Sequence, residues 1–196
     1  RNFDVVIVGG GMVGLSLANQ LIEKKITNSI LIIDKEEKLG LHSSGRNSGV
    51  LHAGLYYEPN SLKAKVCVSG ARRLKSWVLE RGLSINKCGK LIIPTRANLD
   101  CQLEVLAFRG KANGAKVEFW DENQVNDLVP DATCPTGRAL WSPNTAVVKP
   151  IQVINKLQEE LFDKGVKFVF VEPQWSVYEK ENAIKISNNE KINYGH

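Results

Sequence analysis

The chain has 196 residues, of which 43% are hydrophobic and 24% are charged, and its formal net charge is +5. A chain of this size and composition is an ordinary globular one and can bury roughly 70% of the surface that its unfolded form exposes. Its apolar runs are far too short to cross a membrane and its basic residues are spread among acidic ones, so we expect no transmembrane segment and no nucleic-acid partner.

The first 34 residues follow the order strand, turn, helix, strand. Residues 3–8 and 29–33 are apolar runs rich in β-branched side chains, and residues 13–24 between them have the apolar spacing of a helix face. Parallel strands need a crossover of this kind, and such crossovers are nearly always right-handed. The segment therefore predicts one βαβ unit of a parallel sheet.

The rest of the chain predicts more helices and short strands, without an internal repeat. The predicted helices cover residues 61–81, 98–113, a brief stretch between the N-cap Asp121 and Pro130, and a segment from Pro150 to Gly165. The predicted strands cover residues 91–94, 116–120, 166–171 and a terminal hairpin of 183–187 with 191–194.

This order of elements predicts an α/β fold with two layers. We expect residues 1–85 and 149–196 to form a nucleotide-binding domain around the parallel sheet. Residues 86–148 leave that domain and form part of a second, partly antiparallel substrate layer.

The strongest motif is the glycine-rich turn GGGMVG at residues 9–14, between the first predicted strand and helix. It contains the pattern GxGxxG, in which the first glycine permits the tight turn, the second lets a pyrophosphate approach and the third lets helix and strand pack closely. The amides and the positive end of the helix then hold the anion. The predicted cofactor-binding residues of this turn are Gly9, Gly11, Met12, Val13 and Gly14.

An acidic residue follows the second predicted strand. Asp34 lies twenty positions after Gly14, and Lys35 follows it. A carboxylate at this place accepts hydrogen bonds from a ribose diol and repels a 2′-phosphate. The pattern therefore predicts an adenosine dinucleotide. It does not distinguish NAD from FAD, because the adenosine diphosphate part of both cofactors is bound in this way.

The loop HSSGRNSGVLHAGLYY at residues 42–57 has neither the alternation of a strand nor the period of a helix. Small hydrogen-bonding residues of this kind suit close folding against a pyrophosphate and an isoalloxazine ring, which favours FAD over NAD. They are also what any sharp loop requires, so a purely structural role remains an alternative. The predicted cofactor-binding residues of the loop are Ser43, Ser44, Asn47, Ser48 and Gly49.

The same loop, with SLKAKVC at residues 61–67 and CGKLI at residues 88–92, resembles the L-2-hydroxyglutarate oxidase/dehydrogenase family. That family lies within the larger group of FAD-dependent oxidoreductases that includes D-amino-acid oxidase. The resemblance implies a Rossmann-like FAD-binding domain with FAD as the cofactor. It also implies oxidation of a 2-hydroxy acid by hydride transfer to the flavin, with L-2-hydroxyglutarate as the expected substrate and 2-oxoglutarate as the product.

The chain departs from the family pattern H-x-T-G-H-N-S-G-V-I-H-A-G-x-Y-Y at three positions. The changes at Ser44 and Leu51 are mild, whereas Arg46 replaces a histidine. A guanidinium cannot accept a proton, so this position is no base in this chain. Arg46 is instead suited to a phosphate or to a substrate carboxylate.

His52 is the predicted catalytic base, because the oxidation removes a hydroxyl proton and imidazole titrates near neutral pH. The alternative is a buried histidine that is bonded to backbone or cofactor. We expect His42 to be structural. Tyr56 and Tyr57 either line the substrate side or pack in the core.

Members of the family are much longer and complete the nucleotide fold late in their chains. We therefore expect this chain to be an N-terminal part, truncated at its C-terminus, that holds FAD weakly or not at all and does not turn over alone. Three hypotheses follow: a 2-hydroxy acid oxidoreductase with an unknown electron acceptor, a flavoenzyme for an amine, amino acid or glycerol 3-phosphate, and a non-catalytic nucleotide-binding fragment. A nicotinamide dehydrogenase is a minor fourth.

The four cysteines match neither a zinc pattern nor a disulfide framework, so we predict reduced thiols and no metal site. Reduced thiols indicate a cytoplasmic type of compartment, with a peripheral membrane or mitochondrial-matrix location also open.

Overall fold

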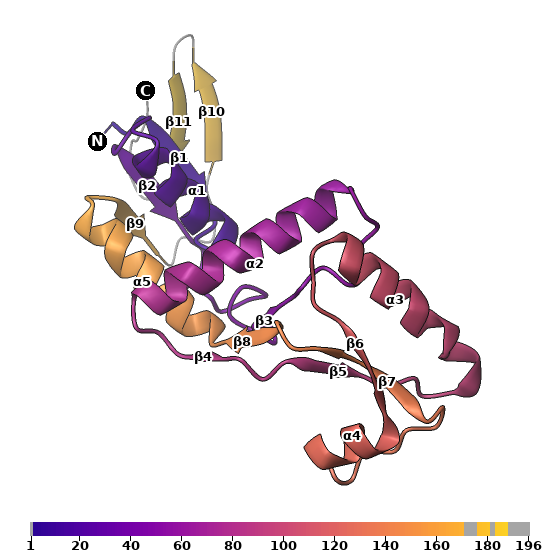
Figure 1. Ribbon diagram of the computed structural model, residues 1–196. Coiled ribbons are helices and arrows are strands. Elements are labelled where there is room, and N and C mark those ends of the chain that lie inside the picture. The colour runs from indigo at the N-terminus through magenta and orange to yellow at the C-terminus, as the bar shows by residue number, and fades with distance from the viewer. Residues whose placement is uncertain (1, 171–175, 181–182, 188–196) are drawn as a thin grey trace. The chain divides into compact units, whose positions relative to one another are not determined.

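The structure is a computed structural model that describes residues 2–170, 176–180 and 183–187 (Figure 1). The chain divides into two compact units. The first unit consists of Arg1–Asn47 with Pro150–His196, and the second consists of Ser48–Lys149.

The first unit contains the predicted parallel sheet. Its strand order is β1-β2-β9, with β1 at Val5–Val8, β2 at Ile30–Ile33 and β9 at Lys167–Val169. All four residues of β2 are buried, as expected of a central strand that is covered on both faces. The α/β class and the opening βαβ unit are therefore confirmed.

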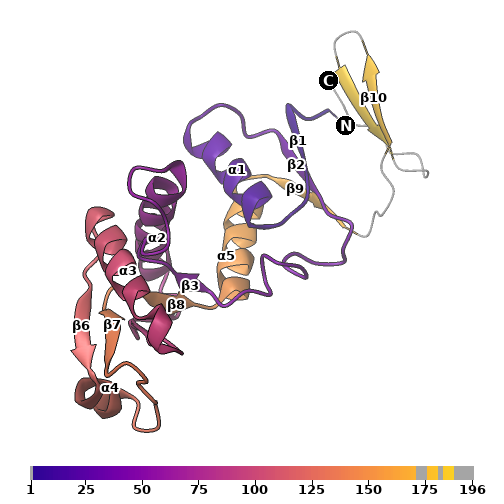
Figure 2. The same cartoon turned by 90° about the vertical axis from the view of Figure 1, so that its right-hand side faces the viewer.

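Two helices connect and cover these strands. Helix α1 at Met12–Glu23 joins β1 to β2, and helix α5 at Pro150–Asp163 precedes β9. The two helices pack against each other, and Figure 2 shows them side by side next to the strands. The predicted helix start at Pro150 is confirmed, and the chain turns into β9 at Gly165, whose φ is +92°.

The second unit contains two small antiparallel sheets. One has the order β3-β8-β4, with the strands Val50–Leu51, Ala146–Val148 and Ile85–Asn86. The other has the order β5-β7-β6, with the strands Lys90–Ile92, Arg138–Ser142 and Glu118–Asp121. An antiparallel layer in the middle of the chain is thus confirmed, although the sequence did not predict β3, β4, β7 and β8.

Helices complete the second unit. They are α2 at Leu62–Glu80, the 3₁₀ turn η1 at Ala97–Leu99, α3 at Cys101–Ala112 and α4 at Glu122–Leu128. Asp121 caps α4 in a reciprocal capping box with Gln124, as its sequence position predicts. The predicted helix at 98–113 is divided, because η1 precedes α3.

Leu103 and Ala107 of α3 pack with Leu140 of β7, while Val125 of α4 packs with Ala139 of the same strand. Neighbouring residues of a strand point to opposite faces, so the two helices contact opposite faces of the β5-β7-β6 sheet.

One boundary and one strand pairing differ from the sequence-based expectation. The units divide after Asn47 rather than after residue 85, because β3 and β4 both pair with β8. The predicted strand 183–187 is present as β11, at Ala183–Ser187, but its antiparallel partner is β10 at Ser176–Lys180. The partner expected from the sequence, residues 191–194, lies outside the described residues. The assignment of the units to cofactor and substrate stays a prediction.

Candidate dinucleotide-binding and catalytic residues

The glycine turn between β1 and α1 has little room for side chains. Gly9 has a φ of +105°, in the region that favours glycine. A Cβ at Gly14 would overlap the carbonyl oxygen of Gly9 and would lie 3.1 Å from Cγ2 of Ile7. Glycine at the first and third positions of the motif is therefore required by the turn itself.

The N-terminus of α1 is open to an anion. Its N-cap residue, Gly11, provides no side-chain cap, and the first turn of the helix has no acidic residue. The backbone N–H of Met12 donates to Oγ of Ser44 at 3.0 Å, and the side chain of Val13 is 84% exposed. The positive end of the helix is therefore not neutralised by a carboxylate in its own first turn.

Asp34 follows β2 and holds the glycine turn. Its Oδ2 accepts from the N–H of Gly10 at 2.7 Å, and its Oδ1 accepts from the N–H of Glu36 at 3.0 Å. Each carboxylate oxygen keeps a further lone pair, which is free to accept from a ribose hydroxyl. The sequence predicted only the ribose role and missed the bond to the turn. Lys35 is exposed, with its Nζ 3.8 Å from Oε1 of Glu36.

The first part of the loop is tied together by its own polar groups. Nδ2 of Asn47 donates to the carbonyl oxygens of Ser43 at 3.0 Å and of Ser44 at 2.9 Å. Nε2 of His42 lies 2.7 Å from Oε1 of Glu36, which agrees with a structural role for this histidine. Asn47 therefore holds the backbone of the loop in the conformation in which Oγ of Ser44 contacts the N-terminus of α1.

The second part of the loop belongs to the second unit. Ser48 is exposed, whereas Gly49 is buried with a φ of +66° and accepts from the N–H of Val148 at 3.0 Å. Of the predicted site residues, those up to Asn47 lie in the first unit. Ser48, Gly49 and His52 lie in the second.

His52 is half-buried at the end of β3 and contacts an aromatic ring. Its imidazole meets Tyr56 edge to face, with ring centroids 5.9 Å apart, and Nζ of Lys90 lies 4.5 Å from the centroid of the same Tyr56 ring. Burial, and then the positive charge of Lys90, lower the pKa of His52 from its ordinary value of 6.5. The imidazole is therefore neutral at pH 7 and able to accept a proton.

Two neighbours of His52 were not predicted as site residues. Lys90 on β5 lies 38 positions further along the chain, and the thiol of Cys67 donates to the carbonyl oxygen of His52 at 3.6 Å. Both residues lie in the segments 61–67 and 88–92, which were noted in the sequence only because they resemble the family. Burial raises the pKa of the Cys67 thiol, so it remains protonated and serves as a donor.

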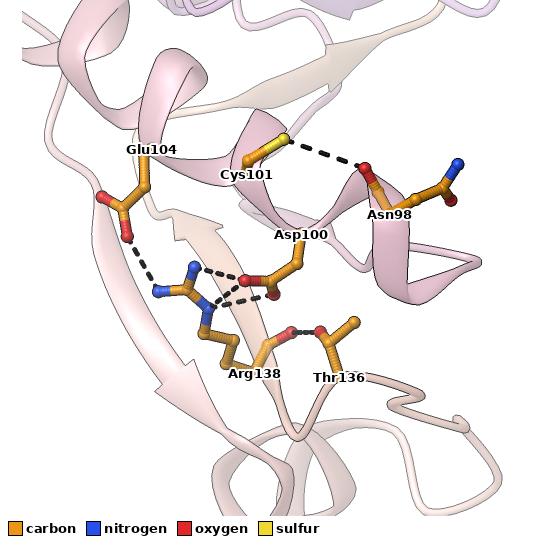
Figure 3. A network of polar contacts seen from close by, with 6 residues as sticks. All are labelled: Asn98, Asp100, Cys101, Glu104, Thr136 and Arg138. Atoms are coloured by element: carbon orange, nitrogen blue, oxygen red, sulfur yellow. Dashed lines mark hydrogen bonds and ion pairs between the residues drawn. The ribbon is translucent and has the colours of Figure 1, made fainter.

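A separate polar network in the second unit is structural (Figure 3). Nε of Arg138 on β7 lies 3.0 Å from both carboxylate oxygens of Asp100, and Nη1 lies 2.8 Å from Oε1 of Glu104. These bonds hold the pKa of Asp100 below its usual range and join α3 to the sheet. Because the guanidinium of Arg138 is already paired with two carboxylates, this network is not a candidate for binding an anion.

The residues present fit the adenosine diphosphate part of a dinucleotide. The turn leaves nothing within 4 Å of a Cβ at Gly9, the helix end is positive, and Asp34 keeps acceptor capacity. Among the described residues, no group of three or more His, Cys, Asp or Glu side chains is arranged to hold a metal ion. All four cysteines are free in the structure.

The fold and the glycine turn define a dinucleotide-binding α/β protein. The chain belongs to the family of FAD-dependent oxidoreductases, which it matches over residues 4–191. FAD rather than NAD is therefore the cofactor of the family, as the 42–57 loop predicted. No helix in the described part of the chain is long and apolar enough to cross a membrane.

Two proteins with similar sequences are both L-2-hydroxyglutarate dehydrogenases. The chain is 37% identical to the mitochondrial L-2-hydroxyglutarate dehydrogenase of Caenorhabditis briggsae, over 95% of this chain and 42% of that protein. It is 30% identical to the L-2-hydroxyglutarate dehydrogenase of Escherichia coli, over 98% of this chain and 45% of that protein. The family resemblance is thereby confirmed, and the chain spans less than half the length of these relatives.

A solved structure supports the fold. The L-α-glycerophosphate oxidase of Mycoplasma pneumoniae with FAD bound superimposes with a TM-score of 0.83 at 22% identity. The match covers 99% of this chain and 52% of the oxidase. The predicted Rossmann-like architecture is therefore that of a known flavoprotein.

Proposed function

We propose that the chain is part of an enzyme that uses FAD to oxidise L-2-hydroxyglutarate to 2-oxoglutarate. The observation that carries this proposal is the similarity over 95% of the chain to a protein named L-2-hydroxyglutarate dehydrogenase. Because the chain spans 42% of that relative, the activity is proposed for the whole protein that contains it.

In this proposal the first unit binds the cofactor. The predicted contacts Gly11, Met12 and Val13 lie at the positive end of α1, which would hold the diphosphate, and Asp34 would accept from the ribose. Oγ of Ser44 already accepts a hydrogen bond from the Met12 N–H at this helix end, and the exposed Arg46 is two residues away from Ser44 in the chain. Arg46 is therefore better suited to a cofactor phosphate than to proton transfer.

Seven further residues complete the proposed cofactor contacts. Gly9 and Gly14 shape the turn, and Lys35 lies next to the ribose acceptor Asp34. Ser43 and Asn47 lie on either side of Ser44 and Arg46. The remaining proposed contacts come from the start of the second unit, at Ser48 and Gly49.

His52 acts as the base of the reaction. Forming the carbonyl of 2-oxoglutarate removes the hydroxyl proton and a hydride from the same carbon of the substrate. Bound FAD supplies the hydride acceptor. His52 accepts the proton on its neutral imidazole, and its lowered pKa keeps it competent below pH 6.5.

A second candidate substrate class is glycerol 3-phosphate or an amino acid. The structural similarity to a glycerophosphate oxidase favours it, but at 22% identity this similarity concerns the fold alone. We also propose that the 196 residues by themselves hold FAD weakly and do not turn over, since the relatives are more than twice as long. The electron acceptor is left open.

The name of one relative bears on the cellular location of the protein. The nematode relative is named mitochondrial. We propose that the protein lies in a compartment that keeps thiols reduced, either the cytoplasm or the mitochondrial matrix, with or without peripheral membrane association.

A substrate panel tests the proposal. The full-length protein is assayed with an artificial electron acceptor and with L-2-hydroxyglutarate, D-2-hydroxyglutarate, L-glutamate and glycerol 3-phosphate. We expect turnover with the first compound alone. Faster turnover of L-glutamate or glycerol 3-phosphate would replace the proposed substrate by the second candidate.

A further inference from the structure

Lys90 is a half-buried lysine whose ammonium contacts an aromatic ring. Its ammonium lies over the Tyr56 ring, 4.5 Å from the ring centroid. No carboxylate of the described residues lies at ion-pair distance from Lys90. Charged groups that leave water are normally paired, so an unpaired ammonium beside a histidine is available to an anionic ligand.

The three side chains come from the same unit and share one aromatic ring. His52 follows β3, Tyr56 lies four residues later, and Lys90 begins β5. Tyr56 is 41% exposed, and both His52 and Lys90 are partly accessible, so a small molecule can reach them. The Tyr56 ring contacts the imidazole at its edge and the ammonium over its face.

We propose that Lys90 binds the carboxylate next to the hydroxyl-bearing carbon of the substrate, and that Tyr56 is a positioning residue for Lys90. This inference rests on the proposed function, whose substrate class it deepens. In a 2-hydroxy acid the hydroxyl and this carboxylate are on adjacent carbons. A base for the one and a cation for the other must therefore be neighbours, as His52 and Lys90 are through Tyr56.

The charge of Lys90 also supports the chemistry of His52. A cation near an imidazole disfavours its protonated form, and Lys90 contributes to the lowered pKa of His52. The groups that contact His52 are the Tyr56 ring, the Cys67 thiol and, through charge, Lys90. Among these described groups, Lys90 is the cationic one.

The test uses the full-length protein and three substitutions. Lys90→Met removes the charge and keeps much of the chain length, Lys90→Arg keeps the charge, and Lys87→Met removes an exposed lysine three residues earlier as a control. For Lys90→Met we expect KM for L-2-hydroxyglutarate to rise about 10- to 100-fold with little change in kcat, because a charge-assisted contact is lost in ground state and transition state alike. Lys90→Arg should stay within about threefold of the unaltered KM.

Two further readouts separate positioning from general damage. The acidic limb of the pH profile of kcat/KM should move to higher pH in Lys90→Met, since the pKa of His52 rises when the neighbouring charge is removed. Tyr56→Phe keeps the ring and should resemble the unaltered protein, whereas Tyr56→Leu should raise KM in the same direction as Lys90→Met. A KM in Lys90→Met equal to that of Lys87→Met overturns the proposal.

Calorimetric binding of L-2-hydroxyglutarate distinguishes this proposal from the proposed function. Binding that is lost in Lys90→Met and kept in Lys87→Met supports Lys90 even where turnover is absent, and absent turnover then counts against the proposed function alone. Binding that is equal in the two variants overturns Lys90 alone. Absence of binding to the unaltered protein overturns both.

Discussion

The two units of the chain differ in what carries their chemistry. In the first unit the candidate site is mainly backbone: a turn in which a Cβ at Gly14 would overlap a carbonyl oxygen, and a helix end whose N-cap residue, Gly11, provides no side-chain cap. In the second unit it is three side chains, His52, Tyr56 and Lys90, positioned by strands of two and three residues. Binding a diphosphate needs amides in a fixed geometry, whereas proton transfer needs a particular side chain. The predicted effects of substitutions therefore differ between the units.

The largest expected effect comes from filling the glycine turn. Gly14→Val places a branched side chain against the Gly9 carbonyl and Ile7, so we expect the free energy of unfolding to fall by about 3 kcal/mol and FAD to be absent. Urea unfolding and the flavin absorbance of the purified full-length protein measure the two effects.

Gly70→Ala is the matched control for this change. Gly70 lies within α2 of the second unit, and a Cβ there has nothing within 4 Å. We expect it to stabilise the protein by about 0.5 to 1 kcal/mol and to leave FAD in place. Full flavin content in Gly14→Val would contradict the assignment of the diphosphate to this turn.

A smaller effect is expected where a side chain supports the same helix end. Ser44→Ala removes the acceptor of the Met12 N–H and should lower the free energy of unfolding by about 1 kcal/mol, with weaker FAD binding. Ser16→Ala, at an exposed hydroxyl further along α1, is the control. Equal FAD affinity in the two variants would mean that Ser44 serves the fold alone.

The smallest expected effect lies in the second unit and depends on pH. Arg138 lowers the pKa of Asp100 from its ordinary value of 3.8, so this carboxylate stabilises the fold above pH 3.8 and less as the pH falls through its folded pKa. Asp100→Asn should lower the urea midpoint slightly at pH 7, and the difference from the unaltered protein should vanish in acid. A difference that persists unchanged at low pH would show that the ion pair is not its cause.

The same contrast explains how far the sequence predicts this molecule. The β1-α1-β2 unit and its glycines follow from local spacing, because the turn and both strands lie within 34 residues. The strands β3 and β4 have two residues each and exist only through pairing with β8, which is about one hundred and about sixty positions away respectively. No local pattern marks such strands.

Contacts between residues that are distant in the chain could not be predicted from the sequence either. The proximity of Lys90 to Tyr56 brings β5 next to the segment that follows β3, and the bond of Asp34 to Gly10 requires the parallel pairing of β1 with β2. His52 was predicted from its motif, whereas its lowered pKa comes from burial and from Lys90. The sequence thus predicted which residues form the candidate site, whereas their burial and their neighbours are known only from the structure.

The central claim is that a cofactor bound through the first unit is reduced by a 2-hydroxy acid whose proton is taken by His52. Single-turnover mixing of the full-length protein with L-2-hydroxyglutarate, without oxygen, tests it by following the loss of flavin absorbance. We expect the unaltered protein to be reduced, and His52→Gln to retain FAD and to be reduced about 100- to 10,000-fold more slowly. An unaltered flavin that L-2-hydroxyglutarate leaves oxidised, or a His52→Gln flavin that is reduced at the unaltered rate, would contradict the claim.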